Sequence, residues 1–378
     1  MWKVNQAFLS KTEARLIKKC FSNTTLSPVP ISVRELGRYG NSGARLLLGV
    51  LSSRMPLVVK IHDKVKIQKE HQAMKRVANF FRDVNLPAEP AYYGDKGALL
   101  YWHQGAGAES QLCSSNELRD IVFDYDEPNR LFRHSDNDIV ALLRKVWHCC
   151  GAARDSAKKA PFNYNDEYKR YMRKEAAEAV LSCIVGRNRD KQDMLFMGGE
   201  VSNPLLFINA KCLQQQYFGK IGPVHGDLHA NNVIVDGSGS VHLIDFAWAT
   251  SRRHVLVDYV LMECSLRFLL FPHHVDPIEQ LEVDTILLKP DGGKRLAGWD
   301  WDSPLANYYR RLGIVVDEIR TQARRFQSDS SDRSFLEYLA AQFLVLFGQM
   351  SYRDYNRLIA VRALGLIARE LITSNFGS

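Results

Sequence analysis

The 378-residue sequence lacks any long apolar run. Its longest apolar stretches, such as Phe343–Phe347, fall far short of the roughly 20 residues that a helix needs to cross a bilayer. Residues Met1–Ser10 also lack the basic region followed by an apolar region that marks a secretory signal. We therefore expect a cytoplasmic protein with no membrane partner.

Neither a cysteine framework nor a nucleic-acid-binding motif is present. The seven cysteines are odd in number, none belongs to a C-x-x-C pair, and Cys149 and Cys150 are adjacent. This pattern favours reduced, buried thiols over disulfides or a zinc site. Because the sequence has no zinc-finger, RNP-like or helix-turn-helix signature, we expect no nucleic-acid partner.

The charge is unevenly distributed along a chain of otherwise ordinary globular composition. There are 50 Lys and Arg against 42 Asp and Glu, a net charge of +8. Residues 1–104 contain 17 basic and 7 acidic residues, whereas the other 274 contain 33 and 35. The basic excess therefore lies entirely in the first 104 residues, where an anionic ligand would explain it.

The hydrophobic pattern changes at the same point. Up to residue 104, alternation and short apolar runs predict a small sheet, and helical spacing predicts two helices. The expected elements are a helix at 7–20, strands at 31–36, 44–51, 56–62 and 98–102, and a helix at 66–81. Residues 116–185 and 250–375 show mainly helical periodicity, and the one clear strand-like region between them is 224–246.

The segment 224–247 carries the clearest chemistry. It places His225, Asp227, Asn232 and Asp245 in order, with Asn232 five and Asp245 eighteen residues after Asp227. An Asp-Gly turn signal between two apolar stretches predicts a hairpin that returns Asp245 to Asn232. An amide oxygen and a carboxylate are hard ligands that suit phosphate-bound Mg²⁺, and Asp227 is left free to accept a proton. The alternative is a hairpin whose Asp and Asn residues serve only the turn.

The pattern H-G-D-x-x-x-x-N followed by I-D-F resembles the aminoglycoside phosphotransferase and choline kinase group, which shares the protein-kinase-like fold. The resemblance covers about residues 31–270. It implies an α+β, bilobal fold, with a small, mainly antiparallel nucleotide-binding lobe at 1–104. A larger helical lobe at 105–378 would carry the catalytic loop and the acceptor site.

The resemblance also assigns roles to residues of the motif. Asp227 would be the catalytic residue, and Asn232 and Asp245 would hold Mg²⁺. His225 would be the structural histidine of the loop, and Asp258 an acidic residue that ties the loop down. His229 fits the group's second histidine, two residues after the aspartate.

Candidates for the remaining elements of a kinase follow in the right order along the N-terminal part. Gly40, Ser42 and Gly43 lie in the turn between the first two strands, where backbone N–H groups could approach phosphate oxygens. An ordinary hairpin turn would look similar. Lys60 lies mid-strand among apolar residues, where a charge needs an anionic partner, and Glu70 in the next helix could pair with it.

Lys60 and Glu70 also have simpler interpretations. Lys60 could face solvent on an edge strand, and Glu70 could be an acid favoured near a helix N-terminus. Gln68 and Gln72 are polar neighbours of Glu70 on the same helix.

The kinase pattern also requires a hinge, which is expected at the end of the last strand of the N-terminal sheet. Its backbone would bind the purine edge of the nucleotide, so the expected cofactors are ATP and Mg²⁺. The residues assigned to it are Tyr101, Trp102 and His103.

The expected reaction transfers the γ-phosphate of ATP to a hydroxyl of a small molecule of aminoglycoside, amino alcohol, sugar or natural-product type. Carboxylates of the C-terminal part could bind a cationic acceptor, or could simply be solvated. The candidates are Glu263, Asp276, Glu279, Glu282, Asp284, Asp300 and Asp302.

Two alternative functions remain open. A protein kinase on the same fold would need an activation segment with an A-P-E-like anchor, and none follows Asp245. A non-catalytic nucleotide-binding module of a signalling or defence assembly would be expected to lose Asp227, Asp245 or Lys60, and all three are present.

Overall fold

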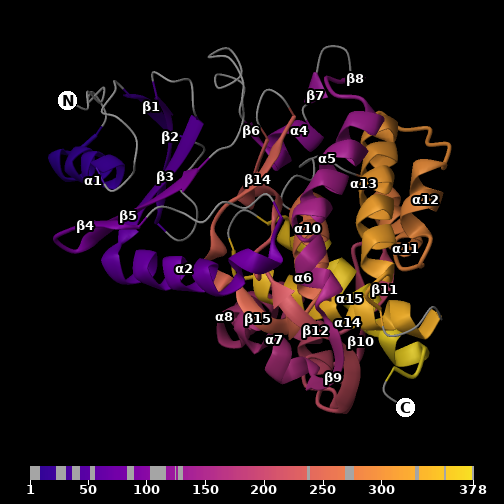
Figure 1. Cartoon of the computed structure of the whole chain (residues 1–378). Coiled ribbons are helices and arrows are strands. Elements are labelled where there is room, and N and C mark those ends of the chain that lie inside the picture. The colour runs from indigo at the N-terminus through magenta and orange to yellow at the C-terminus, as the bar shows by residue number, and fades with distance from the viewer. Residues whose placement is uncertain are drawn as a thin grey trace.

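The computed structural model describes residues 9–22, 31–35, 43–51, 56–82, 89–102, 116–123, 125–126, 131–235, 239–268, 276–327, 332–352 and 355–376. A five-stranded antiparallel sheet lies at the N-terminal side of the molecule, and a larger, mainly helical part lies at the other side (Figure 1). This confirms the expected α+β, bilobal fold. The boundary expected at residue 104 falls outside the described residues.

The N-terminal sheet has the strand order β1-β2-β3-β5-β4. Helix α1 contacts β4 and β5, and α2 contacts β3 and β5. The elements are α1 (Lys11–Ser22), β1 (Ile31–Glu35), β2 (Arg45–Leu51), β3 (Pro56–Asp63), α2 (Lys64–Val77), the 3₁₀ helix η1 (Ala78–Phe80), β4 (Ala91–Tyr93) and β5 (Lys96–Trp102). The predicted strands and helices of this part are all present, with shifted ends.

Side-chain alternation along β3 decides where Lys60 points. Val59 and Ile61 pack in the cluster with α1, whereas Val58 packs in the cluster with α2. Because successive side chains of a strand point to opposite faces, Lys60 shares the α2 face with Val58. On the neighbouring strand β5, Tyr101 lies on that same face.

The helical part is built around α10, whose residues are all buried. Its first elements are β6 (Asn116–Glu117), α4 (Leu118–Val122), β7 (Tyr125–Asp126), β8 (Leu131–Phe132), α5 (Asp136–Cys149), α6 (Gly151–Asp155), β9 (Lys158–Asn163), α7 (Tyr164–Met172), α8 (Lys174–Val185), η2 (Gly186–Asn188), β10 (Asp193–Phe196), β11 (Gly199–Ser202), α9 (Pro204–Phe207) and η3 (Lys211–Leu213). Then follow β12 (Gln216–Val224), η4 (Ala230–Asn232), β13 (Val233–Val235), β14 (Val241–Leu243), η5 (Phe246–Trp248), β15 (Thr250–His254), α10 (Leu256–Phe268), α11 (Pro277–Ile286), α12 (Gly292–Ala297), α13 (Ala306–Arg324), α14 (Asp332–Gln349) and α15 (Arg357–Thr373).

Short strands in this part were missed by the sequence analysis. β9 and β12 pair over six residues, with Phe162 opposite Tyr217 in their register, although periodicity indicated mainly helix over 116–185. These strands are short and their pattern is weak, because only one of the six residues of β9 is buried. No helix among the described residues is long and apolar enough to cross a membrane.

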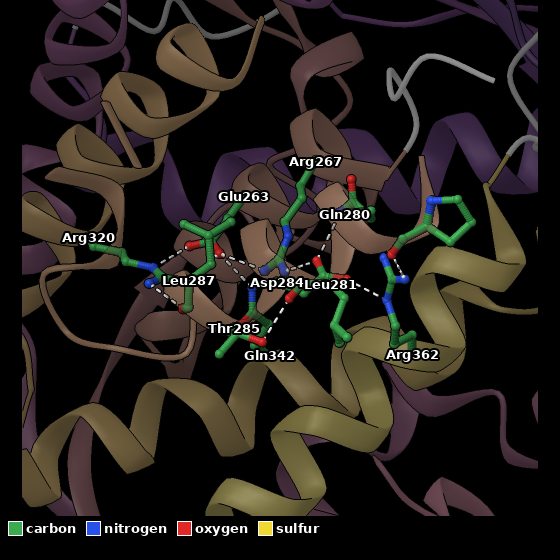
Figure 2. Close-up of polar contacts among 11 residues, drawn as sticks. Glu263, Arg267, Gln280, Leu281, Asp284, Thr285, Leu287, Arg320, Gln342 and Arg362 are labelled. Atoms are coloured by element: carbon green, nitrogen blue, oxygen red, sulfur yellow. Dashed lines mark hydrogen bonds and ion pairs between the residues drawn. The ribbon is translucent and has the colours of Figure 1, made fainter. Parts of the chain in front are cut away.

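Buried charges link four of the helices (Figure 2). Both carboxylate oxygens of Glu263 on α10 accept hydrogen bonds from Arg320 on α13, at 2.7 and 2.9 Å. Asp284 on α11 lies between Arg267 of α10 (Nη2–Oδ1 2.7 Å) and Arg362 of α15 (Nε–Oδ2 3.1 Å). None of these five side chains is more than 3% exposed, so the network fixes α10 from the side away from the catalytic loop.

Candidate active site

β12 ends at Val224 and leads directly into the loop at residues 225–232. The buried ring of His225 joins this loop to the strand hairpin: Nε2 bonds the carbonyl oxygen of Ile244 at 2.9 Å, and Nδ1 accepts the N–H of Asp227 at 3.3 Å. Burial lowers the pKa of His225 to about 4. The ring is therefore neutral at neutral pH, with one nitrogen donating and the other accepting, and His225 has a structural place in the loop.

Helix α10 anchors the same loop at two points. The carboxylate of Asp258 accepts the N–H groups of His225 (2.9 Å) and Gly226 (2.8 Å). Two turns further along α10, the hydroxyl of Ser265 accepts the N–H of Ala230 at 3.1 Å. The loop backbone is thus held by side chains of a buried helix, and Asp258 ties it down as the resemblance implied.

The backbone at Gly226 requires glycine. Its φ is +79°, in the left-handed region, and a Cβ there would overlap the carbonyl oxygen of Trp248. Tyr171 of α7 donates a hydrogen bond to the carbonyl oxygen of Gly226 at 2.7 Å. These contacts hold Asp227, the next residue, with its side chain 29% exposed, so the carboxylate remains accessible.

The strand hairpin brings Asn232 and Asp245 together, as the sequence indicated. β13 and β14 pair with Val233 opposite Leu243, and the N–H of Ile244 donates to the carbonyl oxygen of Asn232 at 3.0 Å. Asp245 follows in a left-handed conformation, with φ 63° and ψ 61°. This turn at the strand end aims the Asp245 carboxylate toward the N-terminal sheet, where it meets Lys60.

Lys60 lies between two carboxylates from different parts of the molecule. Its Nζ is 2.8 Å from Oε2 of Glu70 on α2 and 2.6 Å from Oδ1 of Asp245. The hydroxyl of Tyr101 on β5 donates to the other oxygen of Glu70. Lys60 is 3% and Glu70 2% exposed, whereas Asp245 is 21% exposed. Lys60 and Glu70 are therefore buried, and of the three residues only Asp245 is accessible to solvent.

The charges in this cluster are unequally compensated. Burial raises the pKa of Asp245, but the ammonium of Lys60 outweighs it and holds that pKa below its usual value. Burial and the nearby charge of Asp245 raise the pKa of Glu70 to about 7, despite Lys60. Burial also raises the pKa of Asp227, and His229, whose Nε2 lies 3.9 Å from Oδ2, opposes the rise. The single ammonium of Lys60 thus pairs with two carboxylates. It does not fully neutralise them, so the cluster can accept a further cation.

Asn232 and Asp245 have a donor set that fits Mg²⁺. The amide nitrogen of Asn232 donates to the carbonyl oxygen of Asp227 at 2.8 Å, which leaves the amide oxygen for another partner. Asp245 uses Oδ1 toward Lys60 and retains Oδ2. Mg²⁺ in kinases takes only one or two protein oxygens and completes its shell with phosphate and water, so this pair is sufficient.

The structure brings together Lys60, Glu70, Asp227, Asn232 and Asp245 from the predicted site. Lys60 does not face solvent and Glu70 lies in the second turn of α2, so the simpler interpretations of both are wrong. Among the other predicted nucleotide-binding residues that the structure describes, Tyr101 contacts this cluster through its bond to Glu70. Gly43 is exposed with φ +72°, Tyr101 and Trp102 end β5, and Gly40, Ser42 and His103 lie outside the described residues.

Two of the acidic candidates for acceptor binding are buried and do not serve that role. Glu263 and Asp284 are 0% and 1% exposed and belong to the arginine network of Figure 2. The carboxylate of Glu279 accepts hydrogen bonds from Ser303 and Tyr309, and Asp276 caps α11. Arg267 lies four residues after Glu263 on the same helix, but Arg320 and Arg362, which complete the network, come from distant helices that the sequence alone does not place.

Several residues of the site were not found from the sequence. Ser265 anchors the loop, Tyr101 binds Glu70 through its side chain, and Tyr171 binds the carbonyl oxygen of Gly226. Each acts across a long sequence separation and belongs to no local motif. Tyr101 and Ser265 are polar residues within mainly apolar elements, whereas Tyr171 lies in the mostly polar α7 and has no such signal.

Two family models match the chain. The phosphotransferase enzyme family matches residues 38–252, which include Lys60, Glu70, Asp227, Asn232 and Asp245. The ternary complex associated domain 9 matches residues 169–347. No curated protein matches the sequence.

Solved structures with a similar arrangement include three small-molecule kinases. A thermostable mutant of aminoglycoside phosphotransferase APH(4)-Ia, in complex with ADP and hygromycin B, is 13% identical with a TM-score of 0.45, covering 95% of this chain and 98% of that chain. A putative fructosamine-3-kinase from Thermobifida fusca is 12% identical with a TM-score of 0.41, covering 91% and 97%. Choline kinase LicA from Streptococcus pneumoniae is 17% identical with a TM-score of 0.35, covering 80% and 98%.

Proposed function

The chain belongs to the phosphotransferase enzyme family, and on this premise we propose that it transfers the γ-phosphoryl group of ATP to a hydroxyl of a small molecule. The observation that carries the proposal is the convergence of Lys60, Asp245, Asn232 and Asp227. They come from the sheet, the hairpin and the loop, and Lys60 contacts Asp245 directly.

Lys60 would bind phosphate oxygens of the nucleotide, positioned by Glu70. Asn232 and Asp245 would hold Mg²⁺, which when bound supplies positive charge to the β- and γ-phosphates. Asp227, exposed enough to meet a substrate, would orient the acceptor hydroxyl and take its proton. Positioning and electrostatic stabilisation account for most of the rate in such reactions.

The segment after Asp245 supports a small-molecule acceptor over a protein. Residues 246–255 are all described and form η5 and β15, after which α10 begins at Leu256. β15 pairs with β12, with Arg253 opposite Gly222. No extended activation segment fits in these ten residues, so the platform on which protein kinases bind a peptide is missing there.

The test is turnover by Asp227→Ala. With Mg–ATP and a mixed library of hydroxyl compounds, wild type should add one phosphate to a compound, as detected by mass spectrometry. By analogy with the removal of single preorganised catalytic groups, Asp227→Ala should lower kcat by about 10²–10³. Asp190→Ala, at an exposed turn residue, is the matched control and should retain the wild-type rate. Equal turnover by Asp227→Ala and wild type would remove Asp227 from the mechanism.

The match to the ternary complex associated domain 9 favours a second candidate, a nucleotide-binding module within an assembly. The matched residues 169–347 include the catalytic loop and the helices from α8 to most of α14. Mg–ATP binding without transfer to any compound of the library would favour this second function over the first.

A further inference from the structure

Two arginines lie on either side of Tyr171 in the sequence, the residue that bonds the catalytic loop at Gly226. Arg170, in the last turn of α7, has its guanidinium carbon 3.5 Å from the ring centroid of Trp248. Arg173, the residue that joins α7 to α8 in a left-handed conformation, has its guanidinium carbon 4.6 Å from the ring centroid of Tyr352. Both cations are thus spread over aromatic faces, an arrangement that holds a long side chain in place.

Contacts of the catalytic loop place Arg170 near Asp227. Its neighbour Tyr171 binds the carbonyl oxygen of Gly226 and lies 5.4 Å from Trp248, between ring centroids. The backbone of Trp248 in turn closely approaches Gly226. Burial is the main cause that lowers the pKa of Arg170; Arg253 lowers it further, whereas Tyr171 and, more weakly, Asp227 oppose this.

These arginines differ from their neighbours in their partners. Arg253, on β15, is paired with Glu167 through Nε and bonds its carbonyl oxygen at 2.6 Å. Within the part of the chain that the structure describes, neither Arg170 nor Arg173 forms an ion pair with a carboxylate. Arg170 is only partly exposed, and a cation removed from water without a counter-ion is costly.

Stacking occupies the flat face of a guanidinium but leaves its N–H edge in the ring plane. That edge is the part that binds carboxylate or phosphate oxygens in pairs. Arg170 therefore has its flat face covered by Trp248, and its donor edge has no carboxylate partner among the described residues. It lies close to the loop that carries Asp227, because its neighbour Tyr171 bonds that loop at Gly226. A polycationic acceptor would meet like charge at this point.

We propose that the acceptor is an anionic hydroxyl compound, whose carboxylate or phosphate group pairs with Arg170 while its hydroxyl faces Asp227. This inference rests on the proposed phosphotransferase function and names its substrate class. In the reaction, the acceptor oxygen forms a bond to the γ-phosphorus as the bond from that phosphorus to the β–γ bridging oxygen breaks. The hydroxyl proton goes to Asp227, and ADP leaves.

The other anion that Arg170 could bind is the γ-phosphate of ATP itself. The two cases differ in what the arginine controls. An acceptor-binding arginine sets the KM for the acceptor and leaves the affinity for Mg–ATP unchanged. An arginine bound to the γ-phosphate sets the affinity for Mg–ATP or kcat, whatever the charge of the acceptor.

The first experiment offers the full-length protein Mg–ATP and hydroxyl compounds of three charge classes. The anionic probes are glycerate and glycerol 3-phosphate, the neutral ones glycerol and glucose, and the cationic ones ethanolamine, choline and kanamycin. Phosphorylation of anionic probes, with a kcat/KM at least about 10-fold above that of the neutral ones, is the expected result. If only neutral or cationic compounds are phosphorylated, the proposed function stands and the anionic acceptor is wrong. If Mg–ATP binds but no compound gains a phosphate, both are wrong.

The second experiment measures Arg170→Gln on the phosphorylated probe. Loss of a charge-assisted pair should raise the KM for that probe about 10- to 100-fold, with the Kd for Mg–ATP unchanged. Arg170→Lys keeps the charge and should recover part of the KM, which a purely structural role would not predict. Arg295→Gln, the same substitution at an exposed arginine of α12, should match wild type. An unchanged KM in Arg170→Gln, or a change confined to the Kd for Mg–ATP, overturns the proposal.

Discussion

Asp284 compensates two buried arginines, and Asp284→Asn should therefore destabilise the protein strongly. Its carboxylate binds Arg267 at 2.7 Å and Arg362 at 3.1 Å, and Gln280 donates to it at 3.0 Å. Asparagine has nearly the same shape but carries no charge and presents an NH₂ group to one of the arginines. The network contains two carboxylates, Glu263 and Asp284, and three arginines. The substitution leaves one carboxylate for the three arginines.

The magnitude follows from burial. Asp284 is 1%, Arg362 0% and Arg267 3% exposed, so water cannot replace the lost charge without opening the helix packing. Breaking a buried ion pair by removing one partner costs about 3–5 kcal/mol. We expect the free energy of unfolding to fall by that amount, as a lower urea midpoint with an unchanged dependence on urea concentration.

Asp276→Asn is the matched control on the same helix. Asp276 is the exposed N-cap of α11, and its side chain accepts the N–H of Ile278 at 2.6 Å. Asparagine caps helices about as well as aspartate, so the loss should stay below about 1 kcal/mol, mostly from the weaker interaction with the helix dipole.

A double variant tests the electrostatic reasoning itself. Arg362→Met removes one of the two cations that Asp284 compensates. Adding it to Asp284→Asn should therefore cost less than the sum of the two single losses, by about 1 kcal/mol or more. Additive losses, or a loss below about 1 kcal/mol for Asp284→Asn alone, would refute the view that this carboxylate neutralises buried charge.

Three further predictions concern the candidate active site. Lys60→Met removes the ammonium shared by two carboxylates and should weaken Mg–ATP binding about 10- to 100-fold by titration calorimetry; an unchanged Kd would contradict its assignment to phosphate. The pKa of Glu70 is raised from 4.5 to about 7 by burial and by Asp245, so the folded state binds more protons than the unfolded state between these pH values. The stabilisation from Glu70 is thus complete below about pH 4.5 and is lost as pH rises through about 7, by about 3 kcal/mol; Glu70→Gln should flatten this part of a stability–pH profile, and a profile parallel to wild type would show the shift is wrong. Gly226→Ala forces a left-handed alanine against the carbonyl oxygen of Trp248 and should cost at least about 1–2 kcal/mol of stability, with a fall in kcat larger than the fall in Mg–ATP affinity; wild-type kcat would show that the loop tolerates a Cβ.

The motif residues were predictable because their geometry is local. The Asp-Gly turn signal between two short apolar stretches was enough to pair β13 with β14 and return Asp245 to Asn232. In the same way, the alternation along Val58–Ile61 is enough to place Lys60 on one face of a strand. It cannot say which helix covers that face, and Glu70 became its partner only when α2 packed there.

The acceptor side was not predictable, because its charges are decided by distant partners. From the sequence, Glu263 and Asp284 were candidates for acceptor binding. In the structure, Arg320 and Arg362 from distant helices pair with them, in addition to the nearby Arg267. Arg170 gave no signal among the 50 basic residues. It became distinctive only when Trp248 covered its face and no carboxylate of the described chain covered its edge.

By itself, the sequence determined the two-part architecture, the catalytic motif and the basic excess of the first 104 residues. These depend on periodicity, on spacing within a loop and on simple charge counts, all of which act over short distances along the chain. Only the tertiary structure decided which charges are compensated. Compensation depends on the dielectric surroundings of a side chain and on partners that are often distant in the sequence. It leaves Arg170, next to Tyr171 at the catalytic loop, without a carboxylate partner among the described residues.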